Sequence, residues 1–262
     1  MTSESQPEGI PAATIIIYRN DPEGGAPQVL MTVRSRTMTF AGGMAVFPGG
    51  RVDPSDFALG EFASQRSGGL ISGEEAAHQI AAVRETLEET GLALGLAGDI
   101  NGDKAAEARA MLEEKNELAP VLEAFEWSLD LDQIIPFARW YPKNENIPRV
   151  YDTRFYLANL GTGAVDVSTD NSENTRLFWV SAQGALDMAE TGEIKLIFPT
   201  RRNLERLALF ASFEEARAQA EAIPVKTIVP QVDTSGPEPM LTIMEDAGYP
   251  ITAELLETVA RG

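Results

Sequence analysis

The sequence predicts an α+β fold, built as a single domain over all 262 residues. Short runs of β-branched and apolar residues, which are typical of strands, fall in both halves of the chain. Segments with apolar residues at helical spacing lie among them, without the regular strand–helix alternation of a parallel α/β fold. No internal repeat or low-complexity segment is present, and the absence of cysteine excludes disulfides and thiolate metal sites.

The N-terminal part begins with a predicted hairpin that is followed by a glycine turn. Residues 13–18 and 28–34 are apolar, β-branched runs, and the polar stretch between them contains Pro and Gly, which favours a hairpin loop. A third predicted strand, Met44–Phe47, runs directly into Pro48-Gly49-Gly50. Residues 51–73 are mixed in character and predict a loop or irregular insertion.

The pattern becomes helical at Gly73 and stays so until Gly91, because glycine is typical of the residue that follows a helix C-terminus. Residues 104–125 predict one or two further amphipathic helices. Three strands are expected after them, at Ile134–Tyr141, Tyr151–Leu160 and Arg176–Val180. Two further helices are expected to begin at Ser181 and at Pro199. The tail after Ile223 is rich in Pro, with short apolar runs.

The composition narrows the classes of partner. Net charge is −19, from 21 Lys and Arg against 40 Asp and Glu, so neither nucleic acid nor an anionic membrane is expected as a partner. No run approaches the ~18 apolar residues of a membrane span, and the polar N-terminus lacks an export signal, which favours the cytoplasm. A small polyanionic substrate would need a divalent cation to offset the repulsion. The oligomeric state stays open, with a homodimer as one alternative.

The segment from Arg84 to Leu92 carries the chemistry. Glu85, Glu88 and Glu89 lie three and four residues apart, so on a helix they can share one face. Like charges at this spacing destabilise a helix unless solvent or a cation separates them. Hard carboxylate oxygens suit Mg²⁺ or Mn²⁺. The alternative interpretation is a solvated acidic face without a ligand.

This segment resembles the second half of the Nudix box, whose pattern is G-x5-E-x7-R-E-U-x-E-E-x-G-U, where U is a bulky apolar residue. The matching positions are Arg84, Glu85, Glu88, Glu89, Gly91 and Leu92, while Thr86 stands where U is expected. The resemblance implies a Nudix-type α/β/α sandwich with a mixed sheet, a helical insertion and C-terminal helices. We expect a core over about 13–210, an insertion over about 54–72, a helical segment over about 104–125 and a C-terminal extension over 211–262.

The first half of the box departs from the pattern. Thirty-three residues separate Gly50 from Arg84, where the pattern has 13, and Ala76 occupies the position of the glutamate eight residues before the arginine. We therefore expect 20 residues to be inserted between the glycine turn and the helix. Glu74 or Glu75 is the expected replacement for the missing glutamate, paired with Arg84. The alternative is that the first half of the box is absent.

The resemblance also implies roles for individual residues. Arg84 would orient the carboxylates by ion pairing, and Glu88 or Glu89 would deprotonate the attacking water, with Glu173 as an alternative base from a loop. His78 is interpreted as an ordinary helix residue. The metal ligands that the resemblance implies are Glu85, Glu88, Glu89 and the backbone carbonyl of Gly50.

The stretch Val29–Asp56 resembles the Nudix subgroup that hydrolyses coenzyme A and acyl-CoA, in particular its peroxisomal type. It contains an arginine-serine pair, Arg34-Ser35, a strand into Phe47–Gly50, and Asp53 with Asp56. Further likeness lies at Trp140–Pro142, Arg149–Tyr156 and Phe198–Thr200. This implies cleavage to 4′-phosphopantetheine, or its acyl form, and adenosine 3′,5′-bisphosphate.

The candidate phosphate-binding residues are Arg34, Arg149 and Arg154, and the candidates for stacking an adenine, or else for core packing, are Trp140, Tyr141 and Phe155. Residues 54–72 are expected to form a flap beside the acyl or pantetheine end. One alternative is the same chemistry on another nucleoside diphosphate derivative, such as a nucleotide sugar or a dinucleotide. The other is a non-catalytic Nudix-fold protein that binds a nucleotide or a partner.

Overall fold

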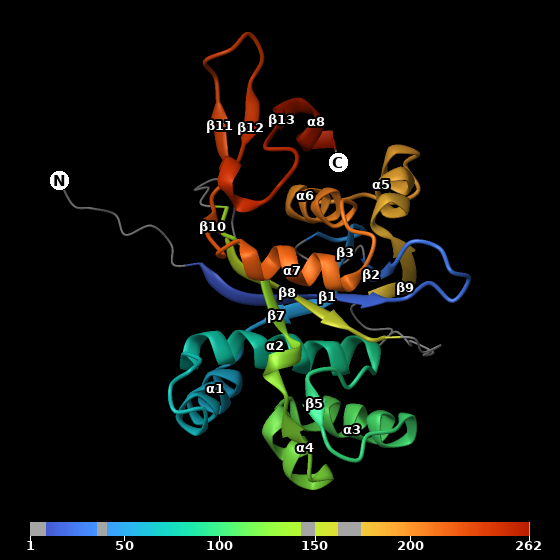
Figure 1. The fold of residues 1–262 in the computed structure, drawn as a ribbon, viewed down its shortest axis with the longest axis vertical. Coiled ribbons are helices and arrows are strands. Elements are labelled where there is room, and N and C mark those ends of the chain that lie inside the picture. The colour runs from blue at the N-terminus through green and yellow to red at the C-terminus, as the bar shows by residue number, and fades with distance from the viewer. Residues whose placement is uncertain (1–8, 36–40, 143–149, 162–173, 262) are drawn as a thin grey trace, which may run out of the picture.

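A mixed eight-stranded sheet forms the centre of the molecule (Figure 1). The computed structural model describes residues 9–35, 41–142, 150–161 and 174–261. The strand order is β10-β7-β8-β1-β2-β3, with β4 paired to β1 and β9 paired to β2. The central pair β1–β8 is parallel and the hairpin pair β1–β2 is antiparallel. The strands are β1 (Ile10–Arg19), β2 (Gln28–Arg34), β3 (Ala45–Val46), β4 (Gly49–Arg51), β7 (Ile135–Trp140), β8 (Tyr151–Asn159), β9 (Asn174–Ser181) and β10 (Thr227–Ile228).

Helices lie on both sides of this sheet, which confirms the predicted α/β/α sandwich (Figure 1). One side carries α1 (Pro54–Arg66), α2 (Gly73–Thr90), α3 (Gly102–Lys115) and α4 (Leu118–Phe125). The other side carries α5 (Ala182–Glu190), α6 (Phe198–Leu207) and α7 (Phe213–Ala222). The segment predicted over 104–125 is therefore two helices, α3 and α4.

The alternation of side chains along β1 explains why the sheet is covered twice. Ile15 and Ile17 are fully buried in the cluster that contains α2, whereas Ile16 and Tyr18 are buried in the cluster that contains α5, α6 and α7. Successive residues of a strand point to opposite faces, so an unbroken apolar strand requires cover on both. The sequence run at 13–18 has this unbroken character.

Helix α2 begins and ends where the sequence predicts. The Ser72 hydroxyl accepts the backbone N–H of Glu75 at 3.1 Å, which caps the N-terminus. At the C-terminus Gly91 adopts φ 76°, a left-handed conformation that favours glycine, and its N–H bonds to the Leu87 carbonyl. Arg84 and the three glutamates that follow it therefore lie on one continuous helix.

The loop or irregular insertion that the local pattern predicted over 51–73 is wrong, because residues 54–66 form α1; the helical insertion that the resemblance implies is present instead. Proline stands in the first turn of α1, and Asp53 precedes it with its backbone N–H bonded to Asp56 at 2.9 Å, a helix start that the sequence pattern contains. The apolar residues are too sparse for a clear helical period: Phe57 and Leu59 pack toward the cluster around α2, while Phe62 is 55% exposed. Packing against α2 decides the conformation that periodicity leaves open.

The C-terminal extension adds a small sheet of its own. Its strands are β11 (Gln231–Asp233), β12 (Met240–Thr242) and β13 (Ala253–Leu255), followed by α8 (Leu256–Arg261), and the β11–β12 hairpin projects from the body (Figure 1). A two-stranded sheet, β5 (Leu96–Ala97) with β6 (Ser128–Leu129), and two 3-10 turns, Leu131–Gln133 and Glu245–Ala247, complete the elements. Among the described residues, no helix has the length and apolar character that a bilayer crossing requires.

Candidate active site

Strand β4 brings the glycine turn onto the carboxylate helix. The backbone N–H of Gly49 donates to Glu89 Oε2 at 3.0 Å, across 40 residues of sequence. A methyl group on Gly50 would lie 2.3 Å from Glu85 Oε1, so glycine lets the turn approach this carboxylate without displacing it. The gap between the two halves of the box is thus closed in space. Antiparallel pairing with β1, in which Gly50 faces Ala13, fixes the turn at this place.

Arg84 is the centre of the polar network beside the turn. Its side chain is 4% exposed, and its Nε and Nη2 donate to Asp56 at 3.1 and 3.0 Å. Nη2 also donates to the Arg51 carbonyl at 2.9 Å, and Nη1 donates to Glu85 Oε1 at 2.9 Å and to Glu88 Oε2 at 3.4 Å. Burial lowers the pKa of Arg84, but the surrounding carboxylates outweigh it and raise the pKa overall. The guanidinium is therefore a fixed charge that is hydrogen-bonded to carboxylates on α1 and α2.

The partner of Arg84 corrects the sequence prediction. Neither Glu74 nor Glu75 reaches it; Asp56 forms the buried ion pair instead. Asp56 lies six residues after Gly50, which is the spacing of G-x5-E with aspartate in place of glutamate. The first half of the box is therefore present, and the 20 extra residues follow its acidic position. Counting forward from the glycine would have found this residue, whereas counting back from the arginine leads to Ala76.

Glu74 and Glu75 pair with Arg154 on the sheet instead. Glu75 also accepts the hydroxyl of Tyr156 at 2.9 Å. These contacts anchor the N-terminal turn of α2 to β8. Arg154, a predicted phosphate-binding residue, is thereby engaged in ion pairs and is only 12% exposed. Two other candidates, Arg149 and Glu173, lie outside the described residues.

The three glutamates form a strained electrostatic group. The pKa of Glu85 is raised to about 8, because burial, together with the charges of Glu89 and Glu88, outweighs the lowering by Arg84. Glu89 is buried, whereas Glu88 has a 35% exposed side chain at the edge of the group. A cation placed among the carboxylates would relieve this repulsion, and their oxygens with the Gly50 carbonyl are a donor set suited to Mg²⁺ or Mn²⁺.

The carboxylates do not already converge on a single point. Within the described part of the chain, no three acidic or histidine side chains are gathered as a ready metal cluster. The reason is visible at Arg84, whose Nη1 bonds to both Glu85 and Glu88. Ion binding would draw these two side chains away from the guanidinium, which keeps Asp56 as its buried partner. The donor chemistry fits a divalent ion, with side-chain rotation required to complete the site.

Arg109 is a supporting residue that sequence reasoning missed. It extends from α3, and its Nε donates to the backbone carbonyl of Glu88 at 2.8 Å. Its Nη2 lies 3.5 Å from the carbonyl of Glu89. The last carbonyls of a helix lack partners within the helix, and a cation there is favourable. Since α3 is distant in sequence, only the fold reveals that it holds the end of the carboxylate helix.

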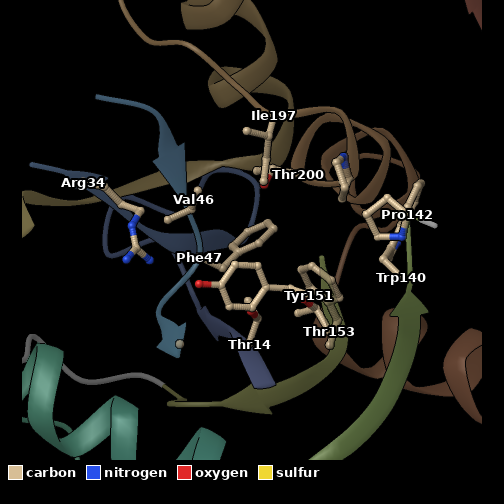
Figure 2. A pocket seen from close by; sticks show the side chains of 13 residues that line it. Thr14, Arg34, Val46, Phe47, Trp140, Pro142, Tyr151, Thr153, Ile197 and Thr200 are labelled. Carbon is tan, nitrogen blue, oxygen red and sulfur yellow. The ribbon is translucent and has the colours of Figure 1, made fainter. Parts of the chain in front are cut away.

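A pocket opens beside the glycine turn, on the side of the sheet that carries α6 (Figure 2). In Figure 2, Arg34 lies at one side and Trp140 with Pro142 at the other, with Phe47 and Tyr151 between them. Alternate residues of β8 face it, and the first residues of α6 close a further side. Its lining residues are Thr14, Arg34, Val46, Phe47, Gly49, Trp140, Pro142, Tyr151, Thr153, Phe155, Ile197, Pro199 and Thr200.

Some of the remaining predicted substrate-binding residues line this pocket and others do not. Arg34, Trp140 and Phe155 line it, together with Gly49 of the turn, whereas Arg154 and Tyr141 do not. The predicted flap over 54–72 contributes no lining residue, since α1 packs on the α2 side of the sheet. His78 is 3% exposed and lies edge-to-face on Phe57, with its Nδ1 2.8 Å from the Glu74 carbonyl. Burial lowers its pKa, which agrees with the interpretation of a packed helix residue.

Comparison with known proteins places the chain in a family. A family model described as the NUDIX domain matches residues 10–198. A chicken (Gallus gallus) protein named acyl-coenzyme A diphosphatase NUDT19 is 26% identical over 78% of this chain and 69% of its own length. A Caenorhabditis elegans protein whose name assigns it to the nudix hydrolases is 29% identical to this chain. The match covers 69% of this chain and 56% of that protein.

A solved structure supports the same assignment at the level of the fold. The NUDIX hydrolase from Alicyclobacillus acidocaldarius superposes with a TM-score of 0.68 at 24% sequence identity, covering 82% of this chain and 97% of the other. The family match spans well over half of the 262 residues and includes both halves of the box. The chain therefore belongs to the Nudix family and is a Nudix pyrophosphohydrolase.

Proposed function

We propose that this chain is a divalent-metal-dependent diphosphatase that cleaves the phosphoanhydride bond of CoA or acyl-CoA. The observation that carries the proposal is the seat of the glycine turn on the carboxylate helix, with Gly49 bonded to Glu89 and Gly50 against Glu85. The products would be 4′-phosphopantetheine, or its acyl form, and adenosine 3′,5′-bisphosphate.

The residues divide the chemistry among them. Glu85, Glu88, Glu89 and the Gly50 carbonyl would hold the ion. When bound, Mg²⁺ or Mn²⁺ neutralises charge on the phosphate oxygens and lowers the pKa of a coordinated water. Glu88 or Glu89 accepts the proton of the attacking water. Arg84 keeps the carboxylates in position from its buried pair with Asp56.

The pocket supports a substrate with an extended apolar or aromatic part. Phe47, Trp140, Tyr151 and Phe155 line it, and aromatic rings can stack a nucleobase or cover an acyl chain. Arg34 lines the same pocket and would meet a phosphate group. The name of the chicken relative, an acyl-CoA diphosphatase, favours CoA among nucleoside diphosphate derivatives.

The substrate assignment is tested with a panel of diphosphates. CoA, an acyl-CoA, ADP-ribose, NADH and a nucleotide sugar are assayed with Mg²⁺ and with Mn²⁺, and kcat/KM is compared. We expect CoA or acyl-CoA to give the highest value. If CoA is hydrolysed no faster than ADP-ribose or NADH, another nucleoside diphosphate derivative is the substrate, and the metal-dependent chemistry stands without the CoA assignment.

The catalytic role of the helix is tested by Glu89→Gln. The amide oxygen of Gln can still accept the Gly49 N–H, so the turn keeps its place while the negative charge is lost. We expect turnover to fall by orders of magnitude with little change in thermal stability. Glu107→Gln is the matched control, because Glu107 is an exposed residue of α3 outside the site. Turnover by Glu89→Gln equal to that of the control would refute the catalytic role of this helix, whereas absence of turnover by the wild-type chain would favour a non-catalytic binding protein.

A further inference from the structure

The C-terminal extension reaches the wall of the pocket through Tyr249. The indole Nε1–H of Trp140, a lining residue on β7, donates to the Tyr249 hydroxyl at 3.0 Å. The Tyr249 hydroxyl in turn donates to Asn203 Oδ1 on α6 at 2.7 Å. The three residues are 1%, 6% and 0% exposed. One hydroxyl therefore links two walls of the pocket, β7 and α6, inside the protein.

Packing fixes the Tyr249 ring as firmly as the hydrogen bonds do. Trp140 meets it edge-to-face with ring centroids 5.6 Å apart, and meets Phe198, at the start of α6, in the same manner at 5.9 Å. The guanidinium of Arg206 lies 5.3 Å from the Tyr249 ring and 3.8 Å from the Phe137 ring. Tyr249 is thus enclosed by residues of β7 and α6, with the guanidinium against its ring.

Gly248, the residue before Tyr249, has a left-handed backbone conformation and close neighbours. Gly248 adopts φ 82°, and a methyl group there would lie 2.9 Å from Gln219 Nε2 and 3.3 Å from Arg206 Cζ. Arg206 donates its Nε to Gln219 Oε1 at 3.0 Å and its Nη1 to the Phe137 carbonyl at 3.0 Å. The extension therefore packs closely against Arg206 of α6 and Gln219 of α7 immediately before Tyr249.

We propose that Tyr249 is a positioning residue that sets the orientation of Trp140 and thereby the affinity of the pocket for its substrate. The inference rests on the proposed function, since it assigns the pocket to the diphosphate substrate. The family match ends at residue 198, whereas Asn203 and Tyr249 lie beyond it. On this proposal, substrate affinity depends on a segment outside the residues that the family model matches, while the carboxylate helix lies inside them.

The test is Tyr249→Phe, which removes one hydroxyl and keeps the ring. Trp140 Nε1 and Asn203 Oδ1 then lose their partner in a buried place, so the indole can turn away from its position. We expect KM for CoA to rise about tenfold, the factor that corresponds to one buried hydrogen bond, with kcat within about twofold. Tyr18→Phe is the matched control, because Tyr18 is also buried and does not line the pocket.

A double variant separates positioning from general destabilisation. In a Trp140→Phe background the hydrogen bond is already absent, so adding Tyr249→Phe should change KM by less than about twofold. The dissociation constant of CoA from each variant, measured by calorimetry without added metal, provides a readout that does not depend on turnover. We expect it to follow KM.

The outcomes distinguish the two proposals. If Tyr249→Phe and Tyr18→Phe give the same KM and the same dissociation constant, Tyr249 does not position the pocket, although the enzyme is still a diphosphatase. A fall in kcat and in melting temperature with unchanged KM would likewise overturn the positioning role. If the wild-type chain hydrolyses no diphosphate with Mg²⁺ or Mn²⁺, the proposed function fails, and binding of CoA weakened by Tyr249→Phe alone would still support the positioning role. Absence of CoA binding to the wild-type chain would overturn both.

Discussion

Asp56 carries the clearest test of how the carboxylate helix is held in place. Its side chain is 1% exposed and accepts hydrogen bonds from both Nε and Nη2 of Arg84. The same carboxylate accepts the backbone N–H of Asp53 at 2.9 Å at the start of α1. Replacing it with Asn removes the charge from the middle of this buried network. Loss of one partner from a buried ion pair destabilises a protein by about 3 to 5 kcal/mol.

We expect Asp56→Asn to lower the free energy of unfolding by about 3 kcal/mol, near the low end of that range, because Arg84 keeps Glu85 at 2.9 Å. Asp53→Asn is the matched control. The Asp53 side chain is 41% exposed and lies 3.6 Å from the Arg84 guanidinium, so its loss should cost less than about 1 kcal/mol. Urea denaturation followed by circular dichroism measures both.

Activity gives a second readout of the same perturbation. Without Asp56, the guanidinium of Arg84 is expected to bind Glu85 and Glu88 more firmly, in competition with the metal. The Mg²⁺ concentration for half-maximal activity should therefore rise in Asp56→Asn, and Asp56→Glu, which restores the residue of the family pattern, should recover it. The reasoning is refuted if Asp56→Asn matches Asp53→Asn in both unfolding free energy and Mg²⁺ requirement.

Three further changes have expected outcomes. Gly50→Ala should abolish most of the turnover, because the added methyl group would overlap the neighbouring carboxylate at 2.3 Å, whereas Gly102→Ala, with no atom within 4 Å, should leave the rate unchanged in the same assay. Arg154→Gln should lower the melting temperature, because two ion pairs to α2 are lost, and leave KM unchanged; a KM raised tenfold would instead give this arginine the phosphate-binding role. The pKa of Glu205 is raised to about 7, because burial outweighs the lowering by Arg202 beside it. Between pH 4.5 and 7 the folded state therefore keeps a proton that the unfolded state loses, so the free energy of unfolding falls as pH rises. Solvent screening limits this loss of stability to about 1 to 2 kcal/mol. Urea denaturation at about pH 5 and about pH 7.5 should show the loss in the wild-type chain and its absence in Glu205→Gln.

The elements that the sequence predicts well are those with a strong local signal. Helix α2 has apolar residues at helical spacing and Gly91 after its last turn, and β1 is an unbroken apolar run. Helix α1 lacks such a signal, since few apolar side chains, Phe57, Leu59 and Ala63, pack inward and its stability comes from contact with α2. A single sequence shows the composition of such a segment but not the surface that covers it, so its conformation is decided at the tertiary level.

The same distinction explains the partner of Arg84. Fixed spacing is a reliable guide only while no insertion intervenes, and counting back from the arginine crosses α1 before it reaches the acidic position. Asp56 is close to the glycine in sequence and close to the arginine in space, at 3.0 Å, although the two lie 28 positions apart in the sequence. The carboxylates themselves needed no such step, because they lie within a single helical turn and a half. Local geometry therefore predicted that the three carboxylates share one helix, and long-range folding determined what holds them.

The residues proposed to select the substrate depend on long-range folding even more than the partner of Arg84 does. The lining of the pocket runs from Thr14 to Thr200, and the tyrosine proposed to position its wall lies 109 residues from its indole partner. No spacing rule connects such residues, because they arrive on several separate strands, loops and helices. The box alone consequently identifies the bond that is broken and is silent on the molecule that carries it. If Tyr249 does control KM while Glu89 controls kcat, the two functions will prove separable along the chain, with catalysis in the shared Nudix part and selection in the extension that packs against it.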